Sequence, residues 1–565
     1  MKKLYTSIFS VIWMLFLCIG IGVNAQITST DLQQKVDSMF GGMAKNAPGS
    51  AVLVVKNKEI ILNIGYGLAN LEYGIPITSK TVFDLASLSK QFAGYAISLL
   101  VEQGKISEND DIRKYIPEFP EFEHTITIKH LLHHTSGLRD WTSTLSLAGR
   151  SFEDVISFEH ILRMAYRQKT LNFEPGSEYN YSNTGYNILA ELVQRVTGVS
   201  FRTWTNQHIF RPLKMPNTFF LDNHREVIPN RAMGYFQTEN VPYRSAPNNL
   251  TALGSSSLYA TTDDLSKWVT HIMHPPDTLK PVVERMLQTD TLTNGKKNTY
   301  AYGIDVSKFH GTAWIAHSGS WASFRTYLVM LPEYDLSVVV LNNNSKNAYR
   351  IARNIVSFYV PESNTENKKD QAEKRKAVDL RQSVLNEYTG TYKLGKGWYV
   401  HLTKEDGTLW TRATNEKKFP MTSLSDTVFS IKAYGNRTMR FYKNESNKVT
   451  HLVYNDMVCP KVSDHIVYTL KNAEDYTGDY FSAELHTLYK VQIKDGQLYL
   501  WSLHNGEIRL EPAWQDDFFS TRFFAKNVEF QRDTYGRITG LLVSQSRAKN
   551  QLFRKLDIDQ QITNQ

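Results

Sequence analysis

The sequence FDLASLSKQFAGYAISLLV, residues 83–101, decides the fold of the first part of this chain. Its apolar residues recur at helical spacing, which predicts a helix from about Ser87 to Gln103. Ser87 and Lys90 are three residues apart and share a helix face, in a first turn whose free N–H groups favour an anion. A lysine that burial keeps neutral can take a proton from such a serine. The pattern therefore predicts a serine nucleophile with a lysine base, and the alternative is an N-capping serine beside a solvated lysine.

A second motif follows in the turn-rich stretch PGSEYNYSNTGYN, residues 175–187, which leads into an apolar helix at 188–193. A phenol near a lysine ammonium is drawn toward phenolate, so Tyr181 is predicted to act as a general base. The Asn183 amide is predicted to hold a substrate carbonyl. The alternatives are a packing aromatic at Tyr181 and a helix N-cap at Asn183.

A third motif, His317-Ser318-Gly319-Ser320, precedes two predicted antiparallel strands, 323–331 and 336–341, joined by the turn at 333–335. We expect an edge strand of small residues beside the nucleophile. Its open backbone N–H and the N–H of Ser87 would then form an oxyanion hole.

These three motifs, in this order and spacing, resemble the active-site set of the class C β-lactamase, penicillin-binding protein and esterase family. Three further stretches resemble the same family: IKHLLHHTSGL at 128–138, RPLKM at 211–215 and LYATTDDL at 258–265. The resemblance runs from about residue 30 to 360. It implies an α/β fold in which helices flank one antiparallel sheet, with a mostly helical lobe from about 105 to 290. The segments 51–55, 60–64, 324–331 and 336–341 would form strands, and 30–44 and 348–356 would form helices.

The resemblance also implies a role for each motif residue. Ser87 would be the acylated nucleophile, and Lys90 and Tyr181 would transfer protons. Asn183 would orient the substrate amide or ester. The N–H groups of Ser87 and Ser320, the latter next to Gly319, would stabilise the oxyanion.

One position departs from the penicillin-directed members, in which the third motif usually begins with a lysine that helps to bind a substrate carboxylate. Here it begins with His317, whose unperturbed pKa near ~6.5 leaves it mostly neutral at pH 7. The sequence therefore predicts weak or no β-lactam hydrolysis and resembles the family's aminopeptidases, esterases and acyltransferases more closely. Trp141, Tyr259 and Trp321 adjoin the motifs and are predicted to line the acyl or acceptor pocket, the alternative being ordinary core.

The N-terminus has the pattern of an export signal. Lys2 and Lys3 precede an apolar run at 8–21, and Val23-Asn24-Ala25 offers a small-residue cleavage site, so residues 1–25 are predicted to be a signal peptide. A retained membrane anchor is the alternative, but the run is shorter than the ~20 residues that a span prefers. The predicted location is the bacterial periplasm or the exterior. Of the two cysteines, Cys18 lies in this signal, which leaves Cys459 as a buried small hydrophobe without a disulfide partner.

A length of 565 residues indicates several domains. The catalytic domain is predicted at 26–361 and a charged linker at 362–382. Two all-β, barrel-like modules are predicted at 383–470 and 471–560, where short alternating runs are separated by turns. The motif around Tyr388 and Tyr392 returns around Tyr476 and Tyr480, and both modules resemble the lipocalin-like modules appended to some family members. These tyrosines are predicted to be core residues. In the functional alternative, one module would lean over the catalytic mouth.

The net charge of +8 lies largely in the signal and the linker, and no nucleic-acid-binding module is recognisable. His130, His133 and His134 have the spacing of a metal-binding helix face, but no carboxylate motif accompanies them. We therefore predict a structural loop there, with no metal and no cofactor.

The predicted function is an exported serine hydrolase that forms an acyl-enzyme on Ser87 and cleaves an ester or amide. Its partner would be a small-molecule or peptide acyl substrate, with no nucleic acid and no membrane span after signal cleavage. The alternative is an acyltransferase that passes the acyl group to an alcohol or amine. A β-lactam sensor is less favoured because a membrane-coupled signalling segment is missing. A non-catalytic binding protein is less favoured because every nucleophile and base position is intact.

Overall fold

The computed structural model describes residues 28–239, 241–360, 380–395, 397–414, 416–464 and 472–556, together with Val378 and Leu470. The predicted signal peptide with Cys18, and most of the predicted linker, lie outside the described residues. No helix among the described residues is long and apolar enough to cross a membrane.

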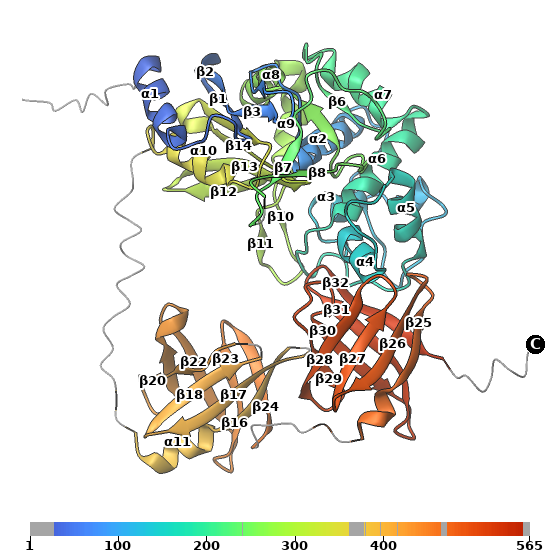
Figure 1. Cartoon of the computed structure of the whole chain (residues 1–565), viewed down its shortest axis with the longest axis vertical. Coiled ribbons are helices and arrows are strands. Elements are labelled where there is room, and N and C mark those ends of the chain that lie inside the picture. Colours follow the sequence, from blue (N-terminus) through green and yellow to red (C-terminus); the bar gives the residue numbers. More distant parts are fainter. Residues whose placement is uncertain are drawn as a thin grey trace, which may run out of the picture.

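A six-stranded antiparallel sheet forms the centre of the first domain (Figure 1). In spatial order its strands are β12 (Asp305–Phe309), β13 (Thr312–Trp321), β14 (Phe324–Leu331), β15 (Leu336–Asn342), β1 (Ser50–Lys56) and β2 (Glu59–Tyr66). The first and last parts of the domain therefore meet where β1 pairs with β15. The small strands β3 (Leu68–Asn70), β4 (Ile75–Pro76), β5 (Phe83–Asp84), β6 (Phe219–Phe220), β7 (Gly234–Phe236), β8 (Arg244–Ala246), β9 (Leu258–Ala260), β10 (Asp290–Thr291) and β11 (Lys297–Asn298) lie around it.

Side chains that alternate along each strand enter two separate cores. Val52 and Val54 face α1 (Ser29–Phe40) and α10 (Ala348–Val356) on one side of the sheet. Ala51 and Leu53 face the opposite core, which includes α2 (Ser89–Glu102), α8 (Thr262–Met273) and α9 (Lys280–Met286). Because both faces are covered, β1 is apolar along nearly its whole length.

Helices make up most of the adjoining lobe, on the right of Figure 1. They are α3 (Ile128–Leu132), α4 (Trp141–Leu147), α5 (Phe158–Arg167), α6 (Asn183–Thr197) and α7 (Phe201–Thr205). The active-site motifs lie between this lobe and the sheet, since α2 packs against α6.

Two all-β modules follow the first domain, so the predicted fold class is confirmed. After α11 (Gln382–Tyr388), the first module is a nine-stranded antiparallel sheet of β16 (Gly390–Gly395), β17 (Trp398–Glu405), β18 (Thr408–Ala413), β19 (Phe419–Pro420), β20 (Thr422–Ser423), β21 (Val428–Ile431), β22 (Arg437–Lys443), β23 (Val449–Tyr454) and β24 (Met457–Ser463). Its two outermost strands, β19 and β20, are separated in the chain by Met421 alone, so the sheet curls back on itself.

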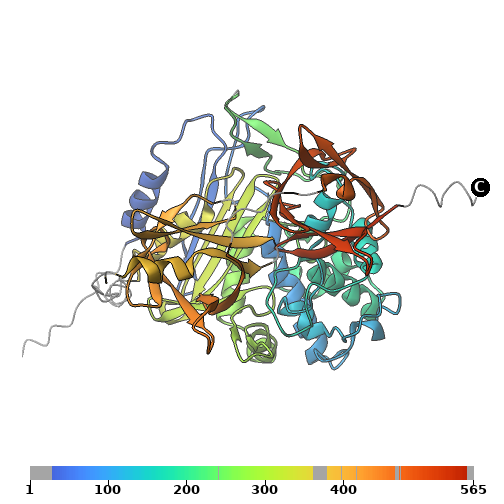
Figure 2. The same ribbon diagram turned by 90° about the horizontal axis from the view of Figure 1, so that it is seen from below.

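The second module is a closed eight-stranded barrel, named the barrel below. Its strands are β25 (Gly478–Ser482), β26 (Thr487–Lys494), β27 (Gln497–Ser502), β28 (Gly506–Trp514), β29 (Asp517–Phe519), β30 (Asn527–Arg532), β31 (Ile538–Gln545) and β32 (Ala548–Lys555). In Figure 1 the barrel lies below the helical lobe, and the first module lies below the sheet. In the view from below (Figure 2) the two modules lie in front of the same parts of the first domain.

The repeated tyrosines have matching places in the two modules. The Tyr392 hydroxyl donates to the Tyr388 carbonyl at 2.9 Å, and the Tyr480 hydroxyl donates to the Tyr476 carbonyl at 2.7 Å. All four side chains are buried, so their prediction as core residues is confirmed. Cys459 is also buried, and it is a free thiol as predicted.

Candidate active site

Ser87 lies in a tight 3-10 turn, η1 (Ala86–Leu88), that runs directly into α2. The predicted helix therefore begins two residues later than expected, at Ser89. Ala86 has a left-handed φ of 49°, a conformation that costs a residue with a Cβ about 1–2 kcal/mol. The Asp84 carboxylate holds this turn, since it accepts the Ala86 N–H at 2.7 Å. This hydrogen bond offsets the backbone strain of the turn that presents Ser87 to the cavity.

Lys90 is fully buried and contacts three oxygen atoms. Its Nζ lies 2.7 Å from Asn183 Oδ1, 2.7 Å from the Ser255 carbonyl oxygen and 3.2 Å from Ser87 Oγ. Burial lowers the pKa of Lys90 well below its ordinary value, and the charge of Arg547 lowers it further, while Asp140 acts in the opposite direction. These directions favour a neutral amine beside the serine.

Asp140 is a functional residue that the sequence analysis missed. It is fully buried and accepts hydrogen bonds from the Asn183 amide nitrogen at 2.9 and 3.2 Å, which fixes the amide with its oxygen toward Lys90. It also caps α4, because its Oδ1 accepts the Thr142 N–H at 2.9 Å. An aspartate directly before an apolar helical run was the sequence pattern that could have identified the cap. Asn183 itself is the first residue of α6, whose N-cap is Ser182.

Tyr181 is enclosed by other rings. Lys90 Nζ lies 4.9 Å from its ring centroid, and the His134 ring is 4.2 Å away, centroid to centroid. Burial raises the pKa of Tyr181 above its ordinary value, and a hydrogen bond with the Ser87 side chain only partly offsets this. The lysine lies over the ring face rather than donating to the phenol oxygen, so the site favours a neutral phenol and not the phenolate expected from the sequence.

His317 is buried on β13 with both ring nitrogens occupied. Its Nε2 lies 2.8 Å from the Tyr300 hydroxyl and its Nδ1 lies 2.7 Å from the Ser318 carbonyl oxygen. A carbonyl only accepts, so the proton is on Nδ1 and Nε2 accepts from the tyrosine. Burial and the nearby Lys90 lower the pKa of His317 to about 3. The ring is therefore neutral, as its unperturbed chemistry already suggested.

The expectation of an edge strand at this place is wrong in one respect. β12 lies outside β13, but their pairing ends at Ala316, so the stretch from His317 to Trp321 keeps an open side. The turn of the nucleophile lies close against this stretch, because a Cβ at Gly319 would overlap the Leu85 carbonyl oxygen and approach Ala86. Glycine is therefore required for this approach, which brings Ser320 to the same cavity as Ser87.

The motifs surround a cavity of about 860 Å3. Ser87, Tyr181, Asn183, His317, Ser320, Trp141 and Trp321 all line it. The rings of Trp141 and Trp321 are 5.8 Å apart and form an apolar wall. Tyr259 was predicted to line this pocket and does not. It is fully buried behind the wall, where its hydroxyl accepts from Asn248 at 2.9 Å and from Arg231 at 3.0 Å.

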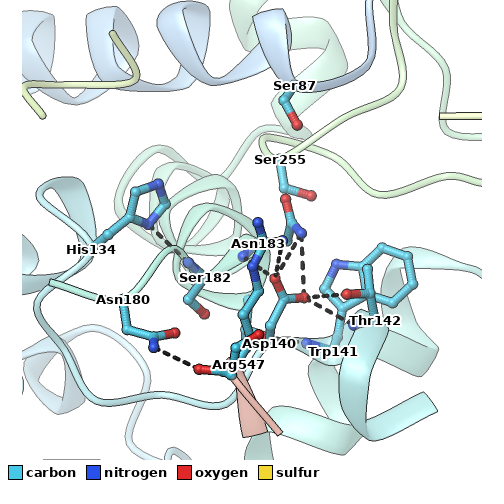
Figure 3. Close-up of polar contacts among 12 residues, drawn as sticks. Ser87, His134, Asp140, Trp141, Thr142, Asn180, Ser182, Asn183, Ser255 and Arg547 are labelled. Atoms are coloured by element: carbon cyan, nitrogen blue, oxygen red, sulfur yellow. Dashed lines mark hydrogen bonds and ion pairs between the residues drawn. The ribbon is translucent and has the colours of Figure 1, made fainter. Parts of the chain in front are cut away.

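The barrel supplies Arg547 to this cavity. Arg547 lies at the tip of the hairpin between β31 and β32, and its guanidinium is 3.4 Å from Asp140 Oδ2 and 4.9 Å from the Tyr181 ring centroid. Figure 3 shows it extending upward from the hairpin, beside Asp140 and toward Asn183. Its carbonyl accepts the Asp140 N–H at 3.0 Å, and the Ser546 carbonyl accepts the Asn180 amide at 2.7 Å. The hairpin tip is therefore part of the wall of the site.

A buried ion pair fastens the barrel to the helical lobe. Arg139 donates to Glu484 at 3.0 Å and to the Lys549 carbonyl at 3.0 Å, and the Arg139 side chain is 1% exposed. The Tyr489 hydroxyl also donates to the Leu147 carbonyl of α4 at 2.7 Å. Arg139 holds the barrel and the next residue, Asp140, orients Asn183, so the docked barrel and the catalytic groups share one loop.

The three neighbouring histidines bind backbone groups rather than one another. His130 Nδ1 accepts the Thr127 N–H at 3.2 Å, His134 Nδ1 accepts the Ser182 N–H at 3.1 Å, and His133 Nδ1 lies 2.7 Å from the Tyr300 carbonyl oxygen. Among the described residues no group of three or more His, Cys, Asp or Glu side chains could hold a metal ion. Their placement fits a structural loop next to Tyr181.

The fold and the serine–lysine–tyrosine arrangement are of the serine hydrolase type. The chain belongs to the beta-lactamase family, whose model matches residues 34–362. It is similar to Protein flp of Staphylococcus aureus (strain MRSA252), with 29% identity over 376 residues, which cover 65% of this chain and 71% of that protein. It is also 29% identical over 325 residues to a D-aminopeptidase of Gluconobacter oxydans (strain 621H), covering 56% of this chain and 61% of the relative.

Among solved structures, the chain resembles the octameric penicillin-binding protein homologue from Pyrococcus abyssi, with a TM-score of 0.54 and 20% identity. The match covers 77% of this chain and 100% of that one. At this identity the likeness shows the fold alone.

Proposed function

We propose that this protein is a serine acyl hydrolase that forms an acyl-enzyme on Ser87 and cleaves an ester or an amide. The carrying observation is the set of oxygen atoms around Lys90 Nζ. The carbonyl oxygens of Asn183 and Ser255, both at 2.7 Å, can only accept hydrogen bonds. A neutral amine has two N–H groups for them, and its lone pair then points to the third neighbour, Ser87 Oγ at 3.2 Å. This geometry supports Lys90 as the base that accepts the serine proton.

The reaction then follows from the arrangement. Ser87 Oγ attacks the acyl carbon while Lys90 takes its proton, and the carbonyl oxygen becomes an anion between the N–H groups of Ser87 and Ser320. The intermediate collapses, and the departing alcohol or amine takes a proton from the Lys90 ammonium or through the Tyr181 phenol. Water next attacks the acyl-enzyme and gives its proton to Lys90. The intermediate then collapses, the Lys90 ammonium returns a proton to the departing Ser87 Oγ, and the acid is released.

The neutral His317 supports substrates other than β-lactams. A buried imidazole whose pKa is lowered to about 3 carries no charge for a β-lactam carboxylate at neutral pH. The similarity to a D-aminopeptidase supports an amide as one substrate of the proposed hydrolase.

Acyl transfer is the second candidate, and the apolar wall of Trp141 and Trp321 favours it. An acceptor alcohol or amine that packs on these rings would occupy the place of the attacking water. The acyl-enzyme and the proton transfers are the same in both reactions.

Incubation of the protein with an activated ester, followed by mass spectrometry, tests the proposal. We expect a mass increase equal to the acyl group, on a peptide that contains Ser87, and no increase in Ser87→Ala. Ser318→Ala is the matched control, since this serine lines the same cavity without a role in the reaction. An undiminished adduct in Ser87→Ala would refute the proposal. Adding alcohols and amines then separates transfer from hydrolysis by the mass of the product.

A further inference from the structure

A second cavity of about 540 Å3 adjoins the proposed active site. Phe152, Ser320 and Trp321 line both cavities, so the two meet at the Trp321 side chain. The second cavity extends past the end of β13, along the first residues of β14. A substrate bound at Ser87 can therefore reach from one cavity into the other beside the oxyanion strand.

Arg325 lines this second cavity. It lies on β14 directly opposite Ser320, and strand neighbours of this kind have Cα atoms about 5 Å apart. One of its N–H groups donates to the Phe324 carbonyl at 2.8 Å. A guanidinium has five N–H groups, and no carboxylate of the described residues lies within ion-pair distance of this one. Burial lowers the pKa of Arg325 from its ordinary value, although arginine stays charged.

The other charged residues that line the two cavities each have a polar partner. Arg547 lies 3.4 Å from Asp140, and Arg244 lies 3.0 Å from Glu153. Asp305 accepts a hydrogen bond from the Thr299 hydroxyl at 2.7 Å. Among the described residues that line these cavities, Arg325 is therefore the cation that pairs with no carboxylate. A half-buried cation of this kind favours the binding of an anion from outside the protein.

The wall between Arg325 and the nucleophile is held in place by hydrogen bonds. The Trp321 indole N–H donates to Asn248 Oδ1 at 3.1 Å, and the Asn248 amide nitrogen donates to Asp84 Oδ2 at 2.6 Å. Asp84 in turn holds the turn of the nucleophile through the Ala86 N–H. The second cavity and Ser87 are thus tied to one network, which gives a fixed relative position of the kind that substrate recognition requires.

We propose that Arg325 forms an anion subsite that binds a carboxylate on the substrate, past Trp321 from the scissile bond. The inference rests on the proposed acyl hydrolase and adds the substrate class, an ester or amide that carries a negative charge. The planar guanidinium would bind the carboxylate in a two-pronged contact, with the (CH2)3 stem and Trp321 packed on the connecting chain. The carboxylate belongs either to the acyl part or to the leaving group, and matched esters distinguish the two.

The first experiment compares kcat/KM for three esters of similar size. They are 4-nitrophenyl butanoate, which is neutral, 4-nitrophenyl hydrogen succinate, which carries the charge on the acyl side, and 3-carboxyphenyl butanoate, which carries it on the leaving group. The third is compared with neutral phenyl butanoate to correct for leaving-group reactivity. We expect one charged ester to be preferred, and Arg325→Gln to reduce that preference by roughly 10–100-fold, the range for a hydrogen-bonded ion pair. Hydrolysis of the neutral esters should change little.

Two variants control for charge and shape. Arg325→Lys keeps the charge without the planar group and should retain part of the preference. Arg350→Gln removes an exposed arginine of α10 that lines neither cavity, so it should leave the preference unchanged.

Calorimetry on Ser87→Ala provides a readout that does not depend on turnover. The charged ester should bind this variant more tightly than its neutral counterpart, and the difference should disappear in Ser87→Ala/Arg325→Gln. Equal binding of charged and neutral esters, or a preference that survives Arg325→Gln, would overturn the subsite. A missing acyl adduct on Ser87 would instead overturn the hydrolase, so the two failures are distinguishable.

Discussion

Arg547 should set the pH at which the proposed hydrolase becomes active, although it lies in a separate β module. The proposed reaction needs neutral Lys90, so kcat/KM should rise with pH through the pKa of Lys90. The positive charge of Arg547 lowers that pKa. In Arg547→Gln the ammonium form of Lys90 is less penalised, its pKa rises, and the ascending limb of the pH profile moves to higher pH.

The size of the shift follows from the distance between the two charges. Lys90 Nζ and the Arg547 guanidinium each lie 4.9 Å from the Tyr181 ring centroid, so they are at most about 10 Å apart. At an effective dielectric constant of about 20, this separation corresponds to about 1.7 kcal/mol. The Arg547 side chain is 44% exposed and pairs with Asp140, so screening should reduce this energy to roughly 1 kcal/mol, which is about a fivefold lower kcat/KM on the ascending limb.

The assay is the pH dependence of kcat/KM for a neutral 4-nitrophenyl ester between about pH 5 and 10, corrected for spontaneous hydrolysis. Arg547→Lys is the matched control, because it keeps the charge and should leave the limb near its wild-type position. A limb that does not move in Arg547→Gln would refute the electrostatic reasoning. An equal shift in Arg547→Lys would show that the shape of the guanidinium, and not its charge, is responsible.

Three further substitutions test the packing of the site. Gly319→Ala forces a Cβ onto the Leu85 carbonyl oxygen. It should lower the free energy of unfolding by about 1–3 kcal/mol and remove most of the activity. A normal melting temperature and a normal kcat/KM would contradict this. Arg139→Met leaves Glu484 without its ion-pair partner and should weaken docking of the barrel by about 3 kcal/mol. The measurement is hydrogen exchange in the β31–β32 hairpin, which should become faster. Unchanged exchange would show that the Arg139–Glu484 pair does not hold the barrel. Tyr489→Phe removes one buried hydrogen bond to α4 and should lower the free energy of unfolding by about 1 kcal/mol, measured by denaturant unfolding; no loss of stability would show that the bond contributes little.

Local sequence patterns predicted the elements whose geometry depends on residues close in the chain. The strand at 51–55 is observed as β1 (Ser50–Lys56), and the predicted helix at 348–356 matches α10. Ser87 and Lys90 are three residues apart across the 3-10 turn and the start of α2, and this spacing brings their side-chain atoms to the observed 3.2 Å. The family motifs located Tyr181, Asn183 and His317, and the structure brings all three to one cavity.

Other features could not be read from local patterns. The strand with His317 is covered along its first half by β12 and open along its second half, because the pairing with β12 ends at Ala316. Tyr259 adjoins a family motif in the sequence but faces Arg231 and Asn248 behind the cavity wall. Asp140 was overlooked because its buried hydrogen bonds to Asn183 span 43 residues.

The sequence by itself determined the chemistry that the chain can offer: a serine and a lysine on one helical turn, a tyrosine and an asparagine on a loop, and a histidine where related enzymes carry a lysine. The tertiary structure decided which protonation states that chemistry uses, because burial lowers the pKa of Lys90 and raises that of Tyr181. It also decided that Arg547 joins the site from 407 positions after Asp140. Charge and solvation act through space, so groups far apart in the chain set the pKa of a residue whose own sequence neighbours are silent about it.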